Sequence, residues 1–98
     1  MMNRANTATL LLRCPDRKGL VAAIANLLSR NGVNIIDAQQ HTDVDAGLFF
    51  HRVMFDMSGM TVSREDFLQL LEQECKTYDM DWRLSFGDKK KRVAIFVS

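Results

Sequence analysis

Disulfide frameworks and membrane-spanning segments are what this sequence most plainly lacks. Its two cysteines, Cys14 and Cys75, lie far apart without framework spacing, so we expect reduced thiols and a cytoplasmic location. No apolar run approaches the roughly 20 residues of a transmembrane helix, and residues 1–6 carry no apolar signal-peptide core. We therefore expect a soluble cytoplasmic protein without a membrane partner.

An excess of either charge is missing as well. The chain has 13 lysines and arginines against 12 acidic residues, which leaves a net charge of +1. Such a balance provides no general attraction for nucleic acid or for an anionic membrane. The 98 residues have room for one compact domain.

Two helices are predicted from apolar spacing and from their end signals. Apolar residues recur at helical spacing over Gly19–Arg30, and Asn31–Gly32 then ends the helix because glycine tolerates a left-handed backbone. Asp16 is expected to cap this helix at its start. Ser63 is expected to cap a second helix, with Asp66 in the capping-box position.

Four segments have strand character, with apolar residues that are continuous or alternate with polar ones. They are Thr7–Arg13, Val33–Thr42, Leu48–Met57 and Met80–Phe86. The polar second half of the second segment is typical of an edge strand.

The resulting order, βαββαβ, predicts an α+β, ferredoxin-like fold over residues 7–86. This fold has a four-stranded antiparallel sheet with two helices on one face. The other face is left to water or to a partner. The same topology serves RNA recognition, but Leu48–Val53 lacks the glycine-flanked aromatic and basic pattern of that module, so we expect no nucleic acid.

The C-terminal segment does not fit a four-stranded unit. Residues 87–92 are polar and basic and are interpreted as a solvated linker. Residues 93–98 form an uninterrupted apolar run, typical of a strand buried on both faces of a parallel sheet. We interpret them as the first strand of a second, truncated α/β domain.

No catalytic constellation is visible in the sequence. His41 and His51 fall on successive strands of the expected hairpin and could lie nearly opposite each other, as cross-strand packing or as part of a metal site. Without a third ligand at fixed spacing, packing is favoured and no metal is expected. Cys14, at the end of a strand, is interpreted as a structural thiol rather than a nucleophile.

The loop before the first helix has binding character. Backbone N–H groups at a helix start can receive an anion such as a carboxylate. Arg17 and Lys18 could attract that carboxylate, Asp16 could hold an ammonium group, and Gly19 permits close approach. On the local residues alone, a capped helix start with solvated charges is the favoured alternative.

Residues from about Thr7 to Phe86 resemble an ACT domain, a βαββαβ module that binds amino acids. The resemblance is carried by Asp16–Val21, by the following helix and by Asn31–Ile35. Many members have proline where this chain has Lys18. The resemblance implies an effector site without metal or cofactor, built from Asp16, Arg17, Lys18, Gly19 and Leu20 of one chain and from Asn34 and Ile35 of another.

The whole chain is also similar to the formyltetrahydrofolate deformylase family, on the opening Leu10–Gly19 and the ending Lys90–Ser98. The resemblance implies that this is an N-terminal regulatory domain of an enzyme that hydrolyses 10-formyltetrahydrofolate to formate and tetrahydrofolate for purine synthesis. Its catalytic residues would lie outside this chain, which should be inactive alone. It further implies a homodimer through the sheet edge and first helix, with glycine or methionine as effector; the alternative is a structural dimerisation module without a ligand.

Overall fold

The computed structural model describes residues 6–87 together with the backbone of residues 92–95. Within these residues, two helices and five strands follow one another. They are β1 (Thr7–Pro15), α1 (Leu20–Arg30), β2 (Asn34–Asp43), β3 (Leu48–Asp56), α2 (Arg64–Thr77), β4 (Asp81–Phe86) and β5 (Arg92–Ile95).

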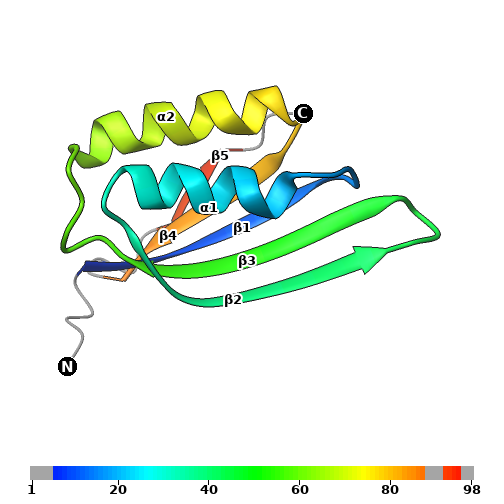
Figure 1. Cartoon of the computed structure of the whole chain (residues 1–98), viewed down its shortest axis with the longest axis horizontal. Coiled ribbons are helices and arrows are strands. Elements are labelled where there is room, and N and C mark those ends of the chain that lie inside the picture. Colours follow the sequence, from blue (N-terminus) through cyan, green and yellow to red (C-terminus); the bar gives the residue numbers. More distant parts are fainter. Residues whose placement is uncertain (1–5, 88–91, 96–98) are drawn as a thin grey trace.

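The strands form one sheet in the order β2-β3-β1-β4-β5, and every neighbouring pair is antiparallel. Both helices lie on the same face of this sheet (Figure 1). The predicted ferredoxin-like fold is therefore confirmed, because β1 to β4 and the two helices form the βαββαβ unit in the expected order.

The core lies between the helices and the covered face of the sheet. Alternate residues of β1, β3 and β4 point into it, among them Leu10, Val53 and Leu84, whose side chains are fully buried. Ile24 of α1 and Phe67 of α2 meet them from the helix layer. Each such side chain contributes about 1.5–3 kcal/mol by leaving water.

One predicted helix cap is present and the other is not. The Ser63 side chain accepts a hydrogen bond from the Asp66 backbone N–H at 3.1 Å, as expected for α2. The prediction for Asp16 was wrong, since α1 starts after Gly19 and has no side-chain cap. β1 continues to Pro15, which leaves Asp16 three residues short of the capping position, and Gly19 occupies it in a left-handed conformation.

The expectation that the sheet has no place for the C-terminal segment was also wrong. Residues 92–95 pair with β4, from Ser85 opposite Arg92 to Trp82 opposite Ile95. The open edge of β4 supplies unpaired backbone groups that a fifth strand can satisfy. Residues 88–91 of the predicted linker 87–92 and residues 96–98 of the predicted strand 93–98 lie outside the described residues. The linker and the assignment of residues 93–98 to a second domain stay predictions.

Candidate functional site

The turn between β1 and α1 brings the predicted loop residues to one end of the sheet. The Asp16 backbone N–H donates to the Gly47 carbonyl at 2.9 Å, which ties the turn to the β2–β3 hairpin. Gly19 has φ +87°, and a Cβ there would meet nothing within 4 Å. The backbone conformation therefore explains this glycine, and the space above it is open.

The first turn of α1 is suited to receive an anion. Its first internal hydrogen bond runs from the Ala23 N–H to the Gly19 carbonyl at 2.9 Å, so the N–H groups of residues 20–22 have no carbonyl of their own helix to bond. No acidic residue lies in this turn. Leu20 could contribute only its backbone to such a site, since its side chain is buried. A bound carboxylate would meet both the N–H groups and the positive end of the helix dipole.

The charged side chains of the turn differ in their surroundings. The Arg17 guanidinium lies 5.2 Å from the centroid of the Tyr78 ring, a cation–π contact that holds the arginine against α2. Asp16 and Lys18 are exposed. Both remain accessible to a ligand or to a second chain.

The thiol next to the turn is not poised for nucleophilic chemistry. Burial, followed by the negative charges of Asp16 and Asp79, raises the pKa of Cys14. Burial also raises the pKa of Cys75 to about 12. Thiolates are the reactive form, so both side chains act as small apolar groups in the core, in agreement with the interpretation of Cys14 as a structural thiol.

Asn34 and Ile35 lie at the opposite end of the sheet from the turn. Pro15 pairs with Leu48 at the hairpin end, whereas Asn34 pairs with Asp56 at the far end. The strands between them span about 25–30 Å at roughly 3.3 Å per residue. One chain therefore does not bring the two halves of the predicted site together.

The two histidines do not face each other. In the β2–β3 pairing, His41 lies opposite Phe50, and His51 lies opposite Gln40. This one-residue offset places the two side chains on different faces of the sheet: His41 is exposed, and His51 is 5% exposed in the core. Within residues 6–87, no group of three potential metal ligands gathers.

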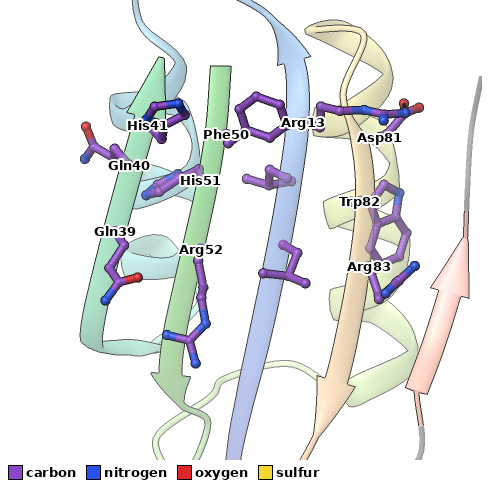
Figure 2. A pocket seen from close by; sticks show the side chains of 12 residues that line it. Arg13, Gln39, Gln40, His41, Phe50, His51, Arg52, Asp81, Trp82 and Arg83 are labelled. Carbon is purple, nitrogen blue, oxygen red and sulfur yellow. Dashed lines mark hydrogen bonds and ion pairs between the residues drawn. The ribbon is translucent and has the colours of Figure 1, made fainter. Parts of the chain in front are cut away.

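A groove on the uncovered face of the sheet was not among the predicted sites. It encloses about 420 Å³ and crosses β2, β3, β1 and β4 over Leu11, Arg13, Phe50, Arg52 and Arg83 (Figure 2). The signal in the sequence was the period-two pattern of β3, which puts Phe50 and Arg52 on the face opposite the core.

None of the described helices is long and apolar enough to cross a membrane.

Comparison with known proteins identifies the family. A model described as the ACT domain matches residues 8–76. A formyltetrahydrofolate deformylase of Synechocystis sp. is 41% identical over 92 residues, which cover 94% of this chain and 32% of the relative. The corresponding Bacillus subtilis protein is 39% identical over 90 residues, covering 91% of this chain and 30% of the relative. The chain thus spans about a third of the length of these curated relatives.

Solved structures agree with this family assignment. A formyltetrahydrofolate deformylase from Pseudomonas syringae superimposes with a TM-score of 0.75 at 30% identity, over 81% of this chain and 26% of that one. An ACT domain protein from Streptococcus pneumoniae shares the fold at 18% identity, with a TM-score of 0.68 over 81% of this chain and 86% of its own. The chain belongs to the ACT domain family.

Proposed function

We propose that this chain is the regulatory domain of a formyltetrahydrofolate deformylase. The proposal draws on relatives of that name at 39–41% identity, of which the chain corresponds to about a third. The parent enzyme would hydrolyse 10-formyltetrahydrofolate to formate and tetrahydrofolate, supplying formate for purine synthesis in the cytoplasm. The catalytic residues belong to the remainder of that enzyme, so this chain alone should not hydrolyse the folate.

The domain pairs with a second copy through β2 and α1. β2 is an edge strand whose residues are almost all exposed, and an unpaired edge favours the addition of another strand. Ile35 of β2 and Val21 of α1 are 39% and 37% exposed, respectively. Burial of these apolar side chains in a symmetric interface would stabilise the pair.

Two-fold symmetry supports an effector site shared between protomers. When two copies of β2 lie antiparallel about an axis normal to the sheet, the Asn34 end of one strand meets the Asp43 end of the other. The Asp16–Leu20 turn stands at that Asp43 end, joined to the hairpin through Gly47. The observation that carries the proposal is that the two half-sites lie at opposite ends of a sheet whose open edge is β2.

The chemistry of the shared site suits a small zwitterion. The N–H groups at the start of α1 would bind a carboxylate, with Lys18 adding positive charge. Asp16 would accept hydrogen bonds from an ammonium group, and Asn34 and Ile35 of the partner would close the other side. Glycine and methionine are the amino acids we propose, acting by favouring one arrangement of the pair.

Thermal unfolding with and without amino acid tests effector binding. Glycine or methionine at ten times its Kd should raise Tm by about 6–11 °C, because a ligand that binds only the folded state adds about 1.4 kcal/mol at that ratio. The double variant Gly19→Ala, Asn34→Ala should lose the shift. Gln69→Ala is the control, because it truncates an exposed side chain of α2 that belongs to neither half-site; it should retain the shift.

The alternative function is dimerisation without sensing. A stable dimer by sedimentation that shows no Tm shift with any amino acid at millimolar concentration would favour that alternative. A monomer at tens of micromolar, again without a shift, would contradict both functions.

A further inference from the structure

Two rows of side chains cross the uncovered face of the sheet. In the first row Leu11 lies between Arg52 of β3 and Arg83 of β4, its partners in the strand pairing. In the second row Phe50 lies between His41 of β2 and Arg13 of β1. Because the rows are two residues apart, the apolar side chains of Leu11 and Phe50 are diagonal neighbours.

These rows form the floor of the groove and give it an apolar centre with a cationic border (Figure 2). Leu11 is 40% exposed, although it stands in the middle of the central strand. Among the described residues, three arginines line the groove against one acidic side chain, Asp81. An apolar floor with this charge imbalance would favour an apolar ligand that carries a negative charge.

The arginines are not equally neutralised. Arg13 forms an ion pair with Asp81 at 2.7 Å, so its positive charge is compensated by this neighbouring carboxylate. The guanidinium of Arg52 is 3.9 Å from the Asp37 carboxylate, and both side chains are about half exposed, which makes that pair weak. Arg52 therefore retains charge and donors for a ligand beside Leu11.

We propose that this groove binds a flat apolar anion. Its ring system would lie over Leu11 and Phe50, and its carboxylate, sulfonate or phosphate group would be bound by Arg52. A planar guanidinium suits such an oxyanion because it offers parallel N–H donors. This site lies on the face and not at the edge of the sheet, and so it is separate from the proposed amino-acid site.

A second copy of the chain is a poorer occupant of the same face. Face-to-face pairing about a two-fold axis would set one arginine-rich lining against another, and like charges brought together in an interface oppose association. Edge pairing through β2, by contrast, would leave this face open. The charge of the groove therefore favours an anionic ligand.

Two fluorescent probes of the same ring type test the proposal. 1-Anilinonaphthalene-8-sulfonate carries an anionic group, whereas N-phenyl-1-naphthylamine has the same rings without it. The full chain should bind the sulfonate saturably, with a Kd on the order of tens of micromolar, as expected for a ligand of about 20 heavy atoms. It should bind the neutral probe about tenfold more weakly, because the charged hydrogen bonds to Arg52 are missing.

Variants on the two sides of the sheet separate the contributions of Arg52 and Leu11 to probe binding. Arg52→Gln should weaken sulfonate binding by about tenfold and leave the neutral probe within about twofold. Leu11→Ser should weaken both probes. Arg30→Gln is the control, since it removes an exposed arginine of α1, on the helix layer, and it should change neither.

Three results would overturn the proposal. The first is sulfonate binding that does not saturate below millimolar concentration, and the second is equal affinity for the two probes. The third is dissociation of a dimer by Leu11→Ser in sedimentation together with no probe binding to the wild type, which would make this face an interface between copies.

Discussion

At the scale of single residues, His51 is the polar side chain whose placement carries the clearest energetic consequence. It is buried on β3 beside Phe49, with ring centroids 5.7 Å apart. Among the described residues neither of its ring nitrogens finds a hydrogen-bond partner. Burial lowers the pKa of His51 below its ordinary 6.5, because a charged imidazolium is poorly solvated in the core.

The lowered pKa predicts acid sensitivity. Below about pH 6.5 the unfolded chain binds a proton at this position more readily than the folded chain does. The free energy of unfolding should therefore fall as the pH is lowered from 7.5 to 5. Urea unfolding across that range, in the wild type and in His51→Leu, measures the contribution of this side chain.

His51→Leu should reduce that pH dependence and raise the unfolding free energy at pH 7 by about 1 kcal/mol. The reason is that an apolar side chain of similar volume replaces an unsatisfied buried polar group. His41→Gln, at an exposed position of β2, should leave the unfolding free energy at pH 7 within about 0.5 kcal/mol of the wild type. An unchanged pH profile in His51→Leu would contradict this account.

At the scale of secondary-structure elements, the turn after α1 docks closely on the turn after β3. The Thr61 N–H donates to the Asn31 carbonyl at 2.9 Å. Gly32 has φ +73°, and a Cβ on it would collide with the carbonyl oxygen of Gly59. This contact fixes the end of α1 and the start of β2 against the loop that leads to α2.

Gly32→Ala should therefore be far more costly than the same change elsewhere. We expect a loss of at least about 3 kcal/mol, from the left-handed backbone and the backbone collision together. Gly19→Ala, at φ +87° with nothing within 4 Å, should cost only about 1 kcal/mol. Chemical denaturation of the two variants measures both values, and equal losses would contradict the docking.

The elements that the sequence could predict are those with strong local signals. Apolar spacing located both helices, and Ser63 with Asp66 fixed the start of α2. The cap of α1 was predicted wrongly because β1 runs on to Pro15, which depends on pairing with Leu48 and not on the local sequence. The His41–His51 offset was missed for a related reason, since register is set by the whole hairpin.

The remaining differences between the prediction and the structure concern surfaces, which a single sequence describes poorly. The apolar run at the C-terminus identified a strand, but not that its residues 92–95 would pair with the open edge of β4. The residues of the groove are ordinary on their own, and only the strand pairing brings Arg52, Leu11 and Arg83 into one row. The structure places the residues of the predicted effector site at both ends of one sheet, and a site built from all of them would need a second chain.

At the scale of the whole molecule, β2 is the surface on which assembly would depend. Ile35→Gln should raise the dimer dissociation constant by at least about tenfold, because two copies of the side chain would lose apolar burial in the symmetric interface. Leu11→Gln is the matched control, since Leu11 and Ile35 are 40% and 39% exposed but Leu11 lies away from the edge. Sedimentation equilibrium measures both, and an effect of equal size in the two variants would argue against pairing through β2.

Complementation between two defective variants tests most directly whether the effector site is shared between protomers. Gly19→Ala damages the turn and Asn34→Ala damages the start of β2, so calorimetry should detect no glycine or methionine binding to either variant alone. In a 1:1 mixture that has exchanged subunits, half of the dimers would be mixed, and each would hold one intact site, restoring about a quarter of the wild-type binding. A mixture that binds no better than the separate variants would contradict the shared site.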